Sequence, residues 1–130
     1  MESNIPNNIK IIANVYPGDF AISADFAQVE QILINLIKNA TEAFDNKKNG
    51  TIHLKAFQGD GSIIIQVEDN GTGIPDDCIE NIFVPFYTTK ENGSGIGLSL
   101  SRQIMQNHNG TISVNSAPNK GSKFSLKFQL

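Results

Sequence analysis

Apolar residues recur at spacings of three and four over residues 29–44, the most extended helical pattern in the chain. They are Val29, Ile32, Leu33, Leu36, Ile37, Ala40 and Phe44. This spacing marks one face of an α-helix, and Asp25 is placed to cap its amino terminus. We expect the helix to end between Asn46 and Gly50. A helix with one apolar face has to bury that face against a second layer.

Short runs of β-forming residues provide that second layer. We expect strands over residues 8–15, 51–57, 62–68, 111–115 and 122–130, with turns at 16–19, 59–61 and 118–121. At strand spacing, Phe57, Phe124 and Phe128 are expected in the core. A second long helix is expected over 96–108, with Ile96, Leu100 and Ile104 on one face, and a short helix within 75–81. This order predicts an α+β two-layer sandwich, a mostly antiparallel sheet with helices on one face.

Composition narrows the classes of function. The chain has 130 residues, 39% of them hydrophobic, which suits one domain with a proper core. We expect that domain over 8–130, after a polar segment, 1–7, that marks a domain boundary. Net charge is −3 and the longest basic cluster is Lys47-Lys48, which argues against nucleic-acid binding. The apolar stretches are too short to span a bilayer, and the lone Cys78 suits a reducing, cytoplasmic setting.

Three polar patterns carry the candidate chemistry, and the first lies on the long helix. Asn35, Asn39 and Glu42 follow one another at spacings of four and three, so they share a stripe beside the apolar face. A solvated helix face is one interpretation of this stripe. Asn is nevertheless a poor helix former, and two of them in mid-helix indicate a function such as orienting a hydrated metal ion.

The second pattern, residues 69–75, follows the end of a predicted strand. An ionised Asp69 only accepts hydrogen bonds, so a partly buried carboxylate there could select the exocyclic amine of adenine over the carbonyl of guanine. Gly71 and Gly73 would let the backbone approach a flat ligand. The alternative is an ordinary Asp-x-Gly turn.

The third pattern, residues 90–98, is a glycine-rich loop that runs into a helix. Accessible backbone amides and the start of a helix together favour phosphate binding, and Lys90 could add a positive charge. A plain surface loop is the alternative. A dinucleotide fingerprint is less favoured, because it requires a βαβ unit around the glycines.

In this order, the patterns resemble the boxes of the ATP-binding catalytic domain of sensor histidine kinases. Residues 35–43 are similar to the N box, 69–73 to the G1 box, 83–90 to the F box and 93–97 to the G2 box. Residues 108–112 are similar to the His-Gly-Gly segment after the family's last helix, with Asn109 in place of the commoner Gly. The wider GHKL superfamily, with gyrase, heat-shock chaperone ATPases and MutL-type proteins, shares the Bergerat fold. The resemblance covers about residues 8–130.

The resemblance implies ATP and Mg²⁺ as cofactors, with roles for individual residues. Asn39 would be the magnesium ligand, Asn35 would support the phosphate end, and Lys90 would join them in catalysis. Asp69 would bind the adenine amine, beside Gly71, Gly73 and Ile74. A lid over the phosphates would comprise Phe86, Thr88, Thr89, Lys90, Gly93, Ser94, Gly95, Ile96, Gly97 and Leu98. Glu42 stands where many relatives carry a basic residue, so it receives no phosphate role.

A kinase is favoured over an ATPase. The hydrolysing relatives carry a Glu one helical turn before the magnesium-binding Asn, but here that position is Asn35, which cannot accept a proton near neutral pH. His53 and His108 lie outside the setting of the family's phosphoaccepting histidine, so we expect both to be structural. The acceptor is then expected on a dimerisation domain that this chain lacks, with a response regulator downstream and little self-phosphorylation.

Two alternatives remain open. A serine/threonine kinase of the anti-sigma-factor type would use a separate small protein as substrate, and a non-catalytic module would only bind ATP or ADP. The run 85–90, Pro-Phe-Tyr-Thr-Thr-Lys, favours the sensor-kinase branch. We expect a cytoplasmic location, including as the cytoplasmic part of a membrane-anchored sensor, with no direct membrane contact by this domain.

Overall fold

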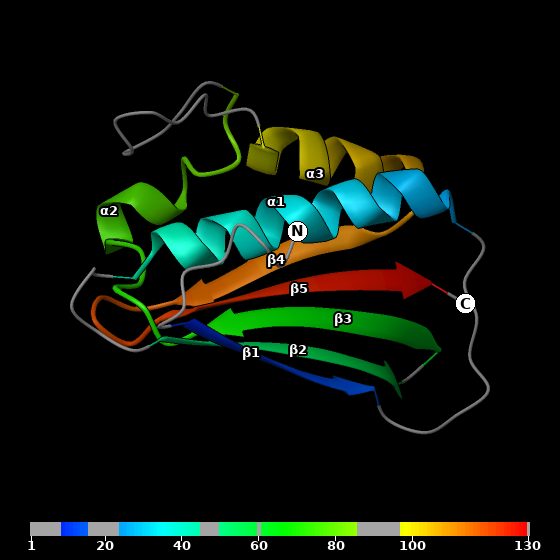
Figure 1. Ribbon diagram of the computed structural model, residues 1–130. Coiled ribbons are helices and arrows are strands. Elements are labelled where there is room, and N and C mark those ends of the chain that lie inside the picture. The colour runs from blue at the N-terminus through cyan, green and yellow to red at the C-terminus, as the bar shows by residue number, and fades with distance from the viewer. Residues whose placement is uncertain (1–8, 16–23, 45–49, 60, 86–96, 130) are drawn as a thin grey trace.

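The computed structural model describes residues 9–15, 24–44, 50–59, 61–85 and 97–129, which form two layers (Figure 1). Five strands make one sheet: β1 (Ile9–Val15), β2 (Gly50–Gly59), β3 (Ser62–Asp69), β4 (Thr111–Ser116) and β5 (Ser122–Gln129). Their order in the sheet is β1-β2-β3-β5-β4, and all pairs are antiparallel except β1 with β2. The helices α1 (Phe26–Glu42) and α3 (Gly97–Asn107) lie side by side on one face, and the short α2 (Asp76–Ile79) lies between β3 and α3 in sequence. The predicted α+β sandwich is confirmed.

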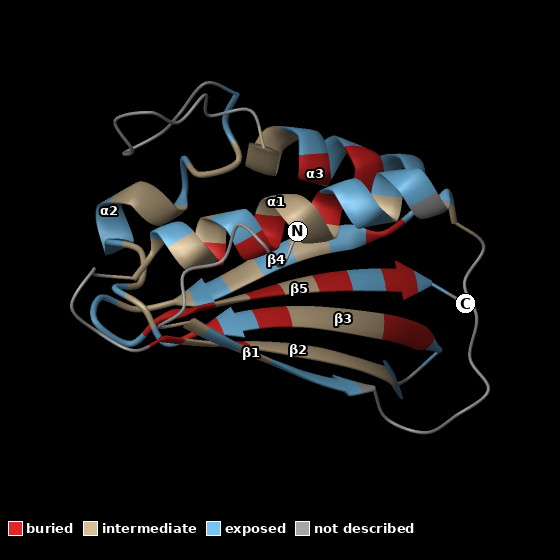
Figure 2. Cartoon of the chain, in the orientation of Figure 1, coloured by how far each residue is buried: buried red, intermediate tan, exposed pale blue. Residues whose placement is uncertain are grey.

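The core fills the space between the helices and the sheet (Figure 2). It comprises Ile32, Leu36, Ile37 and Ala40 of α1, Ile104 and Met105 of α3, and Ile52, Val67, Phe124, Leu126 and Phe128 of the strands. Burying one such aliphatic or aromatic side chain contributes about 1.5–3 kcal/mol. The apolar stripe predicted from the sequence of α1 is therefore the stripe that packs on the sheet.

The first helix begins as predicted but ends earlier. The Asp25 carboxylate accepts the N–H of Gln28 at 3.1 Å, which caps the helix. The helix ends at Glu42 instead of within 46–50, so that part of the prediction is wrong. The cause is tertiary, because the carbonyl of Ala43 accepts a hydrogen bond from the N–H of Thr72 at 3.0 Å. This bond ties the end of α1 to the loop after β3.

One apolar position of α3 is exposed, and one predicted core position is wrong. Leu100 is 42% exposed, because the buried face of α3 runs through Ser101, Ile104 and Met105, about a quarter-turn away. Phe57 is only half-buried and lies outside the core cluster. Side chains alternate along a strand, so Phe57, three residues after the core-facing Leu54, lies on the sheet face opposite the helices. Phe124 and Phe128, in contrast, are confirmed as core residues, 6% and 2% exposed.

His108 joins the end of α3 to the start of α1. Its Nδ1 lies 2.8 Å from the carbonyl oxygen of Ile104, and its Nε2 lies 3.0 Å from the backbone nitrogen of Asp25. The network assigns the proton to Nδ1, because Nε2 has to accept the Asp25 N–H. The ring also meets Phe128 edge-on at 6.4 Å. These contacts support the structural role expected for this histidine. His53 likewise has a structural contact, a hydrogen bond to Asn14 between β2 and β1.

Replacing His108 with Phe tests this connection. The new ring can keep the packing on Phe128 but makes neither hydrogen bond, so we expect the free energy of unfolding to fall by about 1–2 kcal/mol. Urea unfolding followed by circular dichroism measures the change. His53→Phe makes the same change on the opposite face of the sheet, where only one exposed hydrogen bond is lost, and should cost less. An unchanged urea midpoint for His108→Phe would show that the two hydrogen bonds contribute nothing.

Asn109 follows α3 in the left-handed region, at φ 57°. The expectation that Asn can stand for the commoner Gly here is borne out, because Asn adopts this backbone more readily than other non-glycine residues. Within the described ranges, no helix has both the length and the hydropathy needed to cross a membrane.

Candidate functional site

Asp69 ends β3 on the helix-covered side of the sheet and is 6% exposed. One of its carboxylate oxygens accepts the N–H of Gly71 at 2.9 Å, so the loop after β3 folds back over the carboxylate. The sequence predicted a partly buried acceptor at this strand end, and the structure has one.

The two glycines of this loop are required by close backbone approach. A Cβ on Gly71 would lie 2.6 Å from the carbonyl oxygen of Ala43, at the end of α1. Gly73 has φ +73°, and a Cβ there would lie 2.0 Å from the carbonyl oxygen of Ala117. The family resemblance implies that both glycines lie beside a base, and their nearest neighbours in the structure are the protein's own backbone. Ile74, the next residue, is half-buried and packs against the core.

The turn between β4 and β5 holds the loop after β3 in place through hydrogen bonds and close backbone contact. The sequence did not reveal this role. The N–H of Asn119 donates to the carbonyl of Thr72 at 2.7 Å, and the N–H of Ile74 donates to the Ser116 hydroxyl at 2.8 Å. Gly121, at φ +82°, passes so close that a Cβ would lie 2.0 Å from the carbonyl oxygen of Asp69. The sequence showed residues 118–121 only as a turn. Its contact with Asp69 depends on the β3–β5 pairing, which sets Asp69 opposite Ser122.

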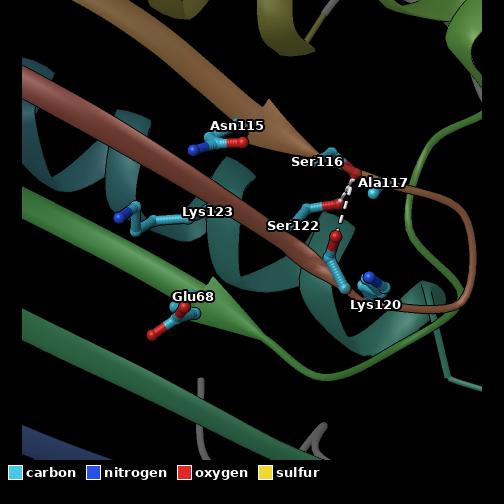
Figure 3. A pocket seen from close by; sticks show the side chains of 8 residues that line it. Glu68, Asn115, Ser116, Ala117, Lys120, Ser122 and Lys123 are labelled. Carbon is cyan, nitrogen blue, oxygen red and sulfur yellow. Dashed lines mark hydrogen bonds between the residues drawn. The ribbon is translucent and has the colours of Figure 1, made fainter.

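The Ser116 hydroxyl is fully used at this junction (Figure 3). It donates to the carbonyl of Gly121 at 2.9 Å, and it accepts the N–H of Ile74. Because its single proton is committed to Gly121, the Ser122 hydroxyl has to be the donor in the 2.9 Å Ser116–Ser122 contact. The three bonds hold the loop after β3 and the β4–β5 turn in one arrangement.

A pocket of about 230 Å³ opens beside this turn, and its lining includes Glu68, Asn115, Lys120 and Lys123 (Figure 3). Glu68 and Asp69 are neighbours in a strand, so their side chains point to opposite faces. This pocket therefore opens on the Glu68 face of the sheet, and Ser116, Gly121 and Ser122 of the junction complete its lining.

Asn35 connects α1 to the start of α3. Its Nδ2 lies 3.3 Å from the carbonyl oxygen of Gly97 and 3.4 Å from the hydroxyl of Ser101, and its Oδ1 accepts from the side-chain amide of Gln31 at 3.1 Å. Two sequence patterns 62 residues apart, the asparagine stripe and the end of the glycine-rich loop, are thus in contact.

Asn39 lies one turn further along α1 and is half-buried, and Glu42 is exposed at the helix end. Among the residues that the structure describes, no group of three His, Cys, Asp or Glu side chains could hold a metal ion. Mg²⁺ bound with a nucleotide keeps several waters and uses phosphate oxygens, so it needs only one or two protein oxygens. A single amide oxygen such as that of Asn39 fits this donor set.

Most of the predicted lid lies outside the described residues. Phe86, Thr88, Thr89, Lys90, Gly93, Ser94, Gly95 and Ile96 belong to the range 86–96, so their roles stay predictions. Gly97 and Leu98 form the first turn of α3, and Leu98 packs against the core. Before the gap, Phe83 meets Phe124 edge-on at 6.5 Å, and the Arg102 guanidinium lies over the Phe83 ring at 5.8 Å. Phe83 therefore connects the segment before the lid to both the core and α3.

Comparison with known proteins agrees with this arrangement. The family described as "Histidine kinase-, DNA gyrase B-, and HSP90-like ATPase" matches residues 24–130. Sporulation kinase A of Bacillus subtilis is 38% identical over 122 residues, 94% of this chain and 20% of the relative. Sensor protein FixL of Bradyrhizobium diazoefficiens is 36% identical over 118 residues, 90% of this chain and 23% of the relative. The chain thus spans about a fifth of the length of these two relatives.

Solved structures give the same result. The nucleotide-free catalytic domain of histidine kinase ThkA superposes with a TM-score of 0.81 at 34% identity, covering 94% of this chain and 79% of that one. Full-length ShkA, solved in complex with AMPPNP, superposes with a TM-score of 0.81 at 28% identity, covering 92% of this chain and 25% of that one. The predicted family is confirmed, and the chain belongs to the histidine kinase-, DNA gyrase B- and HSP90-like ATPase family, with histidine kinase catalytic domains among its structural relatives.

Proposed function

We propose that this chain binds Mg-ATP and transfers the γ-phosphoryl group to a histidine on a separate dimerisation domain, in two-component signal transduction. The observation that carries the proposal is the convergence of three sequence patterns on one helix. Asn35 of α1 contacts Gly97, where the glycine-rich loop ends, and Ala43 just after α1 contacts the Asp69 loop through Thr72. One ligand lying along α1 could therefore reach all three.

In this proposal the Asp69 end holds adenine and the α3 end holds the phosphates. The buried carboxylate accepts from the exocyclic amine, and Gly71, Gly73 and Ile74 lie beside the base. Asn39, between the two ends, offers its amide oxygen to Mg²⁺, which neutralises charge on the phosphates when it is bound. Lys90 and the rest of the range 86–98 cover the phosphates. The AMPPNP complex of the related ShkA supports a nucleotide of this kind.

Transfer to a protein is favoured over hydrolysis. Asn35 cannot act as a general base, and its amide is engaged with Gly97, Ser101 and Gln31. Phosphoryl transfer depends mainly on positioning and charge stabilisation, so an incoming imidazole needs no such base from this helix.

In this proposal, other domains and proteins supply the remaining parts of the reaction. Residues 8–130 form the catalytic domain and 1–7 a segment at its boundary. A histidine-bearing dimerisation domain of the same parent protein supplies the acceptor, a response regulator receives the phosphoryl group next, and both steps take place in the cytoplasm. The sensor and sporulation kinases that match this chain support this assignment.

The test is a transfer assay with γ-labelled ATP. The domain is mixed with the histidine-bearing helical domain of a matched kinase, and the labelled product is exposed to acid, which hydrolyses phosphohistidine but not phosphoserine. Acid-labile label on the helical domain supports the proposal. Acid-stable label on a serine would favour the anti-sigma-factor type of kinase, and nucleotide binding without any transfer would favour a non-catalytic module.

Two exposed apolar side chains flank the range 86–96, and they suggest where the acceptor domain docks. Val84, just before it, is 48% exposed, and Leu100, just after it, is 42% exposed. We expect Leu100→Glu to lower transfer to the acceptor domain at least tenfold, because a charge replaces apolar contact area. Nucleotide affinity should stay within about twofold, since Leu100 points away from the core. Both are measured on one preparation, by the transfer assay and by calorimetry.

Gln106→Glu is the matched control, since it puts the same charge on another exposed side of α3. It should leave transfer within about twofold, because it lies outside the proposed interface. Equal transfer by Leu100→Glu and the parent chain would remove Leu100 from that interface.

A further inference from the structure

The side chain of Asn35 is committed to the protein on both of its ends. Its Nδ2 has two protons, and two acceptors lie within reach: the Gly97 carbonyl at 3.3 Å and the Ser101 hydroxyl at 3.4 Å. Its Oδ1 accepts from Gln31 at 3.1 Å. A side-chain amide with these hydrogen bonds affects a ligand mainly through the groups to which it is bonded.

The group it holds is the first carbonyl of α3. The Ser101 hydroxyl also donates to the Gly97 carbonyl, at 2.8 Å, and the helical N–H of Ser101 is the ordinary partner of the same oxygen. Ser101 is fully buried, 0% exposed, so its hydroxyl serves the protein interior. Asn35 and Ser101 therefore meet at one oxygen, from α1 and from within α3.

Donors on that oxygen affect the next amide. The carbonyl of Gly97 and the N–H of Leu98 belong to one planar peptide unit. Hydrogen bonds to the oxygen polarise the unit and make its N–H a stronger donor. The N–H groups of a helix's first turn have no acceptor inside the helix, and they carry the positive end of its dipole, which favours phosphate.

We propose that Asn35 is a positioning residue: together with Ser101 it fixes the first turn of α3 and strengthens its amides as phosphate donors, acting through Gly97. The inference rests on the proposed function, because the ligand is the phosphate chain of ATP. It assigns Ser101, which the sequence patterns did not single out, to the same task. It also gives the asparagine at this helix position a function that the Glu of the hydrolysing relatives could not perform, because an ionised carboxylate has no proton to donate to the Gly97 carbonyl.

The experiment is a double-mutant cycle with Asn35→Ala, Ser101→Ala and the double variant, titrated with ATP and with adenosine. Each single variant should weaken ATP binding about five- to tenfold, the size of one hydrogen bond, and leave adenosine binding within about twofold. The double variant should be little worse than Asn35→Ala alone, because both side chains act on one oxygen. Gln103→Ala, on the exposed side of α3, is the control and should change neither affinity.

Two results would overturn the inference. If Ser101→Ala left ATP affinity unchanged while Asn35→Ala lowered it, Asn35 would act on the phosphates directly. If the two effects multiplied, the residues would act independently. Hydrogen exchange in the first two turns of α3, measured without nucleotide, should be faster in both single variants, and unchanged exchange would contradict the positioning role. A parent chain that bound no ATP would refute the proposed function, while the exchange measurement would still decide the connection between α1 and α3.

Discussion

Asp69→Asn is expected to weaken ATP binding about 100-fold or more, the largest effect of any conservative change in the site. An asparagine can keep one oxygen as acceptor for the Gly71 N–H, the 2.9 Å bond of the parent chain, so the loop should keep its course. The other carboxylate oxygen is replaced by the amide NH2 group, which can only donate hydrogen bonds. The exocyclic amine of adenine would then face a donor in a buried setting, where a polar group without a partner is costly.

Calorimetric titration with ATP, ADP and GTP in the presence of magnesium measures this effect. The parent chain should bind adenine nucleotides in the micromolar range, about −8 kcal/mol, and bind GTP weakly. Glu68→Gln is the matched control, because it makes the same chemical change one residue earlier, on the opposite and exposed face of β3. Equal binding of ATP and GTP, or unimpaired binding by Asp69→Asn, would contradict the adenine pocket. Urea unfolding of the same variants separates lost affinity from lost stability.

Local patterns predicted the parts of the fold that depend on local chemistry. The stripe from Val29 to Ala40 sets the orientation of α1, and Asp25 caps it. The strands were placed within two residues at each end, because their composition and the glycine-containing turns between them are local signals. The burial of Asp69 was likewise predicted from local sequence, because the residue stands at the end of a strand.

The errors have a common origin in contacts between distant segments. The end of α1 depends on Thr72, which lies 29 residues after Ala43, and no residue in the helix itself signals that bond. Leu100 and Ser101 differ by one helical step, so the α3 pattern could not show which of them faces α1. Asn35 settles the choice by contacting Ser101. Phe57 continues an apolar run, but the register of β2 with β3 puts it on the sheet face opposite the helices.

The candidate site was predicted as three separate patterns, and the structure adds what holds them together. Ser116, Asn119 and Gly121 support the Asp69 loop, and Ser101 supports the junction of α1 with α3. None stands in a sequence pattern that suggests chemistry, since serine, asparagine and glycine are common near turns. The importance of Ser116, Asn119 and Gly121 follows from the antiparallel pairing that brings the β4–β5 turn beside the end of β3, and that of Ser101 from the contact between α1 and α3.

Gly73 gives the sharpest test of that supporting turn. Its φ of +73° and that of Gly61, +75°, are nearly equal, so Ala meets the same backbone strain at both positions. That strain is about 1–2 kcal/mol. The surroundings differ, because a Cβ on Gly73 would lie 2.0 Å from the carbonyl oxygen of Ala117, whereas a Cβ on Gly61 would have nothing within 4 Å. The overlap at Gly73 is with backbone, which cannot rotate away as a side chain could.

Gly73→Ala is therefore expected to lower the free energy of unfolding by about 3–5 kcal/mol, and Gly61→Ala by about 1–2 kcal/mol, in urea unfolding. The Gly73 variant should also lose ATP affinity in calorimetry, below its unfolding midpoint, because the β4–β5 turn and the Asp69 loop have to move apart. The Gly61 variant should bind as the parent chain does, since it lies at the opposite end of β3. Equal losses of stability at the two positions would mean that backbone conformation alone requires glycine at residue 73. A larger loss at Gly73 with unimpaired nucleotide binding would separate the supporting turn from the adenine pocket.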